Sequence, residues 1–132
     1  MCQKNNTPVE HPSVVCYRAY EHQNKSRDTK HRKLTSFYRG QPKPRIGVTT
    51  YAKRDPFHAF CTREDVVRWN DCNGTQYSAV VFECVLQGDL ETGEWSDDVE
   101  VKTYTGMELK IVREVGHIDK GNEQIKWTRL TL

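Results

Sequence analysis

Histidine and cysteine side chains at short spacing are the residues of this chain that suit zinc chemistry best. His58 and Cys61 form a His-x-x-Cys pair, and Cys72 follows after a predicted helix. Zinc binding takes three or four ligands at accepted spacings. The remaining candidates for a fourth ligand are His31, Cys84 and His117. A set this scattered is not a zinc motif, so we predict no metal and no cofactor, with Cys61 packed as a small hydrophobic residue and His58 in a capping or surface role.

A second group with chemical potential is an arginine, a hydroxyl pair and a glutamate, in that order along the chain. Arg18 lies on a predicted early strand, Thr49 and Thr50 lie on a later one, and Glu83 lies in the most apolar strand. The order resembles one class of ADP-ribosyltransferases, which implies that the arginine and the glutamate hold NAD and polarise its ribose. The paired-glutamate motif of that class is missing. The alternative for Glu83 is a solvent-facing position, or a pairing with Arg18 or Arg113 across strands.

Basic and acidic residues are sorted by position along the chain. Residues 1–54 carry twelve Lys and Arg against three Asp and Glu, a formal charge of +9. Residues 55–132 carry eight Lys and Arg against fifteen Asp and Glu, a formal charge of −7. Charge blocks of this kind indicate binding partners rather than a fold.

The basic residues between 25 and 54 form the candidate binding site. They are Lys25, Arg27, Lys30, Arg32, Lys33, Arg39, Lys43, Arg45, Lys53 and Arg54. Such side chains neutralise phosphates, and Phe37, Tyr38 and Tyr51 offer stacking faces for bases. The same charges would speed docking onto an acidic protein surface. The alternative without a partner is a solvated loop that its charge keeps soluble.

The sequence predicts a cytoplasmic protein without a membrane partner. It contains no run of about 18 apolar residues, and its N-terminus lacks the apolar core of a secretory signal. Its five cysteines are an odd number and are scattered along the chain. Free thiols in a reducing compartment are therefore expected.

The hydrophobic pattern predicts the α+β class, with one short helix and a mainly antiparallel sheet of about six strands. Strand patterns lie at residues 14–20, 34–39, 48–51, 77–87, 99–104, 107–115 and 125–130. Thr62 and Asp65 resemble a capping box that starts the helix. Residues 1–13 are predicted as a flexible lead-in, and residues 14–132 as a single domain with a basic loop at 21–33. The long apolar run at 77–87 is predicted as the centre of the sheet.

Three segments in the second half of the chain carry a resemblance to known proteins. They are an aromatic-His segment at residues 57–61, a strand that ends in glycine at 80–89 and a strand with Lys-Ile-Val-Arg-Glu at 109–115. Together with the short helix they resemble a family of small bacterial and bacteriophage proteins of unknown function. The basic insertion at 21–33 departs from that pattern. The resemblance implies an origin in a phage or mobile element, and small proteins of that origin often bind and disable a host factor.

We therefore predict a non-enzymatic binding protein, encoded by a phage or mobile element, that occludes a host macromolecule through its basic face. The expected partner is a host protein or ribonucleoprotein complex, as for an inhibitor of host defence such as an anti-CRISPR protein. Two alternatives stay open. One is a small enzyme similar to ADP-ribosyltransferases, and the other is a nucleic-acid-binding accessory protein.

Overall fold

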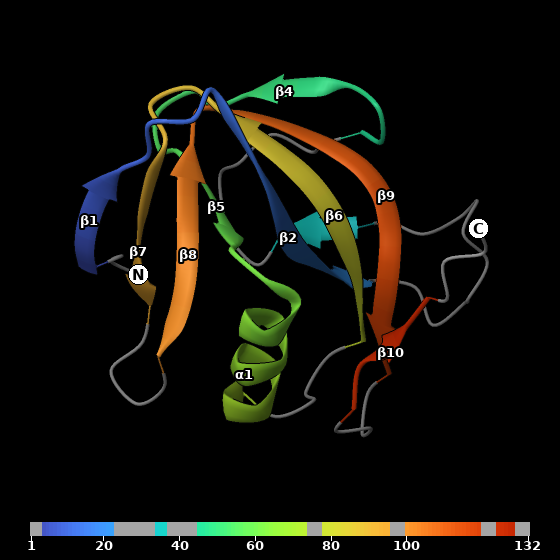
Figure 1. Cartoon of the computed structure of the whole chain (residues 1–132). Coiled ribbons are helices and arrows are strands. Elements are labelled where there is room, and N and C mark those ends of the chain that lie inside the picture. Colours follow the sequence, from blue (N-terminus) through green and yellow to red (C-terminus); the bar gives the residue numbers. More distant parts are fainter. Residues whose placement is uncertain are drawn as a thin grey trace.

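The computed structural model describes residues 4–22, 34–36, 45–73, 78–95, 100–119 and 124–128. The strands are β1 (Lys4–Pro8), β2 (Ser13–His22), β3 (Leu34–Ser36), β4 (Thr49–Tyr51), β5 (Phe57–Phe60), β6 (Ala79–Gln87), β7 (Glu91–Trp95), β8 (Val101–Gly106), β9 (Glu108–Ile118) and β10 (Lys126–Trp127). The helix is α1 (Arg63–Asn73), which lies below β5 in Figure 1. Among the described residues, no helix has the length and apolar character that crossing a membrane requires.

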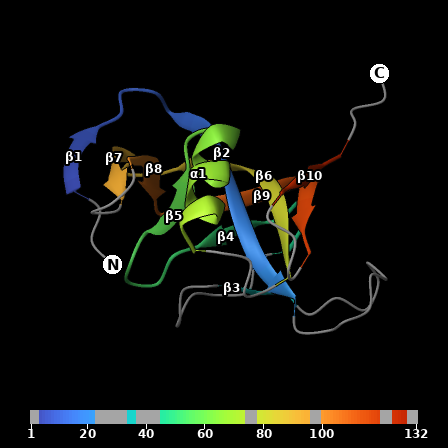
Figure 2. The same cartoon turned by 90° about the horizontal axis from the view of Figure 1, so that it is seen from below.

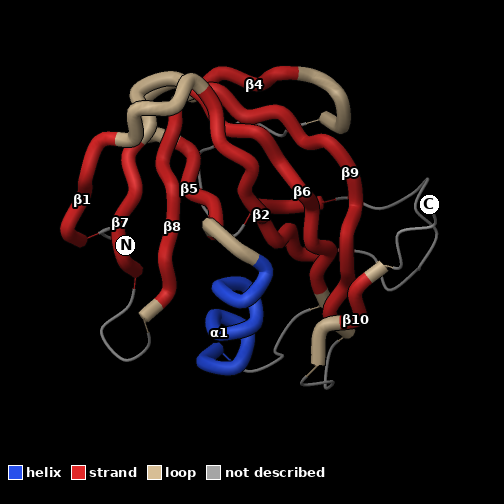
Figure 3. Tube along the Cα trace, viewed as in Figure 1, coloured by secondary structure: helices blue, strands red, loops and turns tan. Residues whose placement is uncertain are grey.

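The described strands form one twisted sheet (Figure 3). It has ten strands, and every ladder between two of them is antiparallel. The strand order is β1-β7-β8-β5-β2-β6-β9-β10, with β3 beside β2 and β4 beside β9. The predicted combination of a mainly antiparallel sheet and a short helix is present. The predicted number of about six strands is too low, because the short strands β1, β5 and β7 carry no clear alternating pattern.

The N-terminal part of the described chain contains a strand within the predicted lead-in at residues 1–13. Residues 4–8 form β1, which pairs with β7 along the edge of the sheet. After β1 the Val9 backbone N–H donates to the Leu90 carbonyl at 2.9 Å, and the Val9 side chain packs against the core. A polar edge strand is stabilised by backbone hydrogen bonds to a distant segment, so hydrophobic alternation does not reveal it.

Alternation along β2 and β6 builds a core on each face of the sheet. The first, which we call the inner core, contains Cys16, Tyr20, Phe57, Ala59, Val80, Phe82, Cys84, Leu86, Leu90, Leu109 and Ile111. The second, the helix-side core, contains Ala19, Phe60, Val66, Ala79, Val81, Val101, Val115 and Ile118. The predicted central position of the strand at 77–87 is confirmed for its described residues, because β6 lies between β2 and β9.

Helix α1 covers only part of the helix-side face. It contacts β8, β2 and β5, and Figure 2 shows it beside β5 and β2. Its own residue Val66 is fully buried against the sheet, and its Trp69 packs against Phe60 with ring centroids 5.4 Å apart. The same sheet face continues past the helix onto the N-terminal half of β2, where Val15 is 53% exposed. The helix therefore leaves this part of β2 open to solvent.

Candidate binding surface

Exposed apolar side chains gather at one edge of the sheet. Of the six large apolar side chains exposed among the described residues, four lie on or next to β4 and on the adjoining strand β9. These four are Ile46, Val48, Tyr51 and Val112, with exposed fractions of 60%, 54%, 64% and 41%. The exposed cations in the same segments are Arg113, which is paired with Glu83, and also Arg45, Lys53, Arg54 and Lys110. We call the four apolar residues and the last four cations the β4 surface.

The pairing of β4 with β9 decides which side chains face outward. Thr49 lies opposite Lys110, and Thr50 lies opposite Leu109. Leu109 belongs to the inner core, so Thr50 faces inward with it. Because successive residues alternate, Tyr51 points outward on the same side as Lys110. The strand thus presents an aromatic ring and a lysine together.

A tight turn before β4 presents the other two apolar side chains of that segment. The Val48 N–H donates to the Arg45 carbonyl at 3.3 Å, and Gly47 between them has a φ of 82°. The Gly47 N–H donates to the Ile111 carbonyl at 2.8 Å, and Ile46 forms a parallel bridge with Ile111. A positive φ favours glycine, because a β-carbon is strained there. The turn is therefore fastened to β9, while Ile46 and Val48 remain exposed.

The β4 surface carries excess positive charge. Its four cations have two acidic neighbours by sequence and register, the exposed Asp55 and the half-buried Glu108. Three predicted site residues belong to it: Arg45, Lys53 and Arg54. The other seven, which are Lys25, Arg27, Lys30, Arg32, Lys33, Arg39 and Lys43, lie outside the described residues, as do Phe37 and Tyr38. The exposed apolar residues of this surface were not identified from the sequence. The signal that could have shown them is the presence of Ile46 and Val48 in a segment otherwise typical of a loop.

The structure does not bring together the residues of the transferase hypothesis. Arg18 lies opposite Phe82 on the inner face, 3% exposed, with its guanidinium 5.2 Å from the Tyr20 ring centre and 5.4 Å from that of Phe57. Glu83 lies on the opposite face of the sheet. Its carboxylate accepts from Nη2 and Nε of Arg113 at 3.0 and 3.3 Å. The alternative role of Glu83, as a partner for an arginine on a neighbouring strand, is confirmed with Arg113.

Replacing Glu83 by glutamine is expected to change the free energy of unfolding by less than about 1 kcal/mol, because the Arg113 side chain of this ion pair is well exposed. We also expect no NAD-dependent mass increase on host proteins incubated with either form. The measurements are urea unfolding and intact-mass spectrometry. An added ADP-ribose unit that disappears with Glu83→Gln would restore the transferase hypothesis.

The candidate zinc ligands do not form a site in the described residues, where no three metal-binding side chains gather. The Cys61 Sγ lies 3.9 Å from the Thr92 hydroxyl, and burial raises the pKa of this thiol to about 11. Burial and then the positive charge of Arg18 lower the pKa of His58. The Cys72 side chain is outside the description. Cys61 is therefore a protonated thiol at neutral pH, packed beside Thr92.

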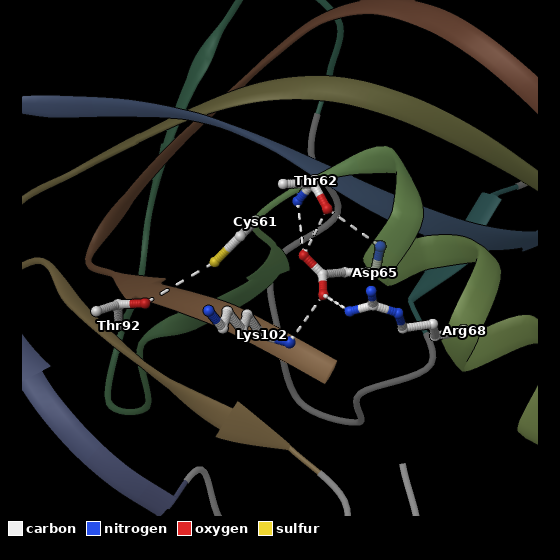
Figure 4. Close-up of polar contacts among 6 residues, drawn as sticks. All are labelled: Cys61, Thr62, Asp65, Arg68, Thr92 and Lys102. Carbon is white, nitrogen blue, oxygen red and sulfur yellow. Dashed lines mark hydrogen bonds and ion pairs between the residues drawn. The ribbon is translucent and has the colours of Figure 1, made fainter. Parts of the chain in front are cut away.

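A compact polar cluster at the start of α1 also contains a carboxylate, a hydroxyl and a thiol (Figure 4). The Asp65 Oδ2 accepts from the Thr62 N–H at 3.0 Å and from its hydroxyl at 2.7 Å, while Oδ1 accepts from the Lys102 N–H at 3.0 Å. In return the Asp65 N–H donates to the Thr62 hydroxyl at 3.2 Å. The predicted capping box is confirmed. Both carboxylate oxygens accept protein hydrogen bonds, so the cluster fastens α1 to β8.

Comparisons with protein-family models, with curated proteins and with solved structures find no match to this chain. The family resemblance suggested by the sequence therefore stays a prediction. The functional argument depends on the residues of the chain itself, and above all on the β4 surface.

Proposed function

We propose that this chain is a non-enzymatic binding protein that uses the β4 surface to occlude a negatively charged region of a macromolecular partner. The observation that carries the proposal is the gathering of exposed apolar side chains and cations at one sheet edge. Apolar side chains that are exposed together, rather than singly, mark interaction sites. Arginine and aromatic residues are enriched in such interfaces.

A solvated loop explains this surface less well than a binding site does. Charge alone would keep the segment soluble, and it does not call for apolar side chains in water. Single exposed apolar residues are ordinary, but Ile46, Val48 and Tyr51 lie within six residues of each other. Val112 extends the group onto β9. The combination favours association by apolar burial with charges that steer the encounter.

The binding role is also supported by the contacts of the two candidate reactive carboxylates, which both bond to groups of the protein itself. Glu83 is paired with Arg113, and Asp65 accepts hydrogen bonds from Thr62 and Lys102. A source in a phage or mobile element, and action against a host ribonucleoprotein or another part of host defence, belong to this proposal. They depend on the sequence resemblance alone.

Changing Arg45, Lys53 and Arg54 together to alanine is expected to weaken partner binding about tenfold, at roughly 0.5 kcal/mol for each exposed charge. The tagged protein is purified from its host cells with and without nuclease, and the affinity of the captured partner is then measured for both forms. The loss should shrink at high salt, because exposed charges are screened.

The matched control changes three exposed cations elsewhere, Arg68, Lys102 and Lys126, to alanine. It removes the same net charge from α1, β8 and β10. Binding by this control should stay within about threefold of the parent protein, since distant surface charges act weakly. Equal losses in the two variants would show a nonspecific charge effect, and no loss in either would remove the β4 surface from the proposal.

A further inference from the structure

The chemistry of the β4 surface distinguishes between two classes of partner. Nucleic acids offer phosphate charge and the π faces of bases, which aromatic side chains stack on. Within this surface only Tyr51 has an aromatic ring. Ile46, Val48 and Val112 are aliphatic, exposed and without a π system. Aliphatic groups gain little from a sugar-phosphate backbone, but they bury well against the apolar centre of a protein interface.

Along the chain, the apolar residues of the β4 surface have cations on both sides. Arg45 precedes the apolar residues Ile46, Val48 and Tyr51, and Lys53 with Arg54 follows them. The apolar group therefore has cations at both of its ends along the chain. Protein interfaces bury an apolar centre inside a polar rim, and rim charges choose the partner by complementarity.

Backbone contacts fix this apolar group in place before any partner arrives. The Gly47 N–H donates to the Ile111 carbonyl at 2.8 Å, and the Ala52 N–H donates to the Met107 carbonyl at 2.8 Å. Both ends of the segment are thus bonded to the chain at β9. A surface held in this way loses little conformational entropy on binding, which favours a specific partner.

On the basis of the proposed function, we infer that the partner of the β4 surface is a protein whose binding face has aliphatic or aromatic residues bordered by Asp and Glu, and is not a nucleic acid. The aliphatic residues supply affinity through burial, and the cations at each end supply orientation and association rate.

Three labelled probes test the inference with the full chain in a fluorescence anisotropy assay. The first is an amphipathic helical peptide with Leu on one face and Glu on the other, the second is poly-glutamate of the same charge, and the third is oligothymidine. At physiological salt we expect the amphipathic peptide to bind at least about tenfold more tightly than either polyanion, because only this probe can bury the aliphatic residues. Tighter binding of oligothymidine would overturn the inference in favour of nucleic acid.

The substitutions Ile46→Ser, Val48→Ser and Tyr51→Ser, made together, separate apolar burial from charge. They should weaken binding of the amphipathic peptide about 100-fold and leave the affinity for both polyanions within about threefold of the parent value. Because these side chains are exposed, the melting temperature should stay near that of the parent protein. Val67→Ser, at a partly exposed position of α1, is the control that should leave the binding of all three probes unchanged.

The outcomes also separate this inference from the proposed function. If all three probes lose affinity only when Arg45, Lys53 and Arg54 are changed to alanine, the β4 surface binds by charge alone and the inference fails while the function stands. If no probe depends on either set of substitutions, both fail.

Discussion

Phe82→Ala is expected to lower the free energy of unfolding by about 3–5 kcal/mol. Phe82 is 3% exposed on the central strand β6, in the middle of the inner core. Its ring meets that of Tyr20 edge-on, with centroids 5.8 Å apart. The loss follows from apolar area returned to water, from the cavity that the smaller side chain leaves and from the lost ring contact. Urea unfolding followed by circular dichroism measures it.

The matched control for this prediction is Val15→Ala on β2. Val15 also belongs to the sheet but is 53% exposed, so its truncation should cost no more than about 0.5 kcal/mol. A typical domain of this size has only about 5–15 kcal/mol of stability, so the expected difference between the variants is large. If Phe82→Ala behaved like the control, Phe82 would not be a core residue and the order of strands around β6 would be wrong.

The sequence predicts well those strands and helices whose own residues carry a clear hydrophobic or capping pattern. Strand β6 is found because its side chains alternate through a long apolar run, and α1 is found because Thr62 and Asp65 satisfy its first turn. Strands β1 and β7 are polar, and β5 is four residues long. These three strands are stabilised by ladders with segments distant in sequence, so no local pattern identifies them.

The candidate sites depend on strand register, which the sequence does not reveal either. Arg18 and Glu83 were a reasonable pair by type and order, but the register places Arg18 opposite Phe82 and Glu83 opposite Tyr17. Shifting the register by one residue would put Arg18 and Glu83 on the same face of the sheet, and register depends on the packing of both strands. The charge of Arg45, Lys53 and Arg54 is enough to predict them as candidate binding residues. The exposure of Ile46 and Val48 beside them is a tertiary property that the sequence pattern does not contain.

Asp65→Ala is expected to lower the free energy of unfolding by about 3 kcal/mol, because the buried carboxylate is the acceptor for donors from two parts of the chain. Without it the Thr62 N–H, at the start of α1, and the Lys102 N–H, on β8, lose their acceptors at 3.0 Å. Both bonds are part-buried, so each donor that loses its acceptor costs up to the desolvation of that group. Hydrogen exchange at these two amides should therefore rise along with the global loss of stability.

Glu64→Ala is the control that isolates those hydrogen bonds from the charge effect. Glu64 is exposed in the same first turn of α1, so its removal takes one negative charge from the helix N-terminus as Asp65→Ala does. Interaction with the helix dipole accounts for roughly 0.3–1 kcal/mol in either case. The loss of stability for Asp65→Asn should lie between those for Asp65→Ala and Glu64→Ala. The amide keeps one acceptor oxygen, but its NH2 group faces one of the two sets of N–H and O–H donors. Equal losses for Asp65→Ala and Glu64→Ala would mean that the helix dipole accounts for the whole effect and that the link from α1 to β8 adds nothing to stability.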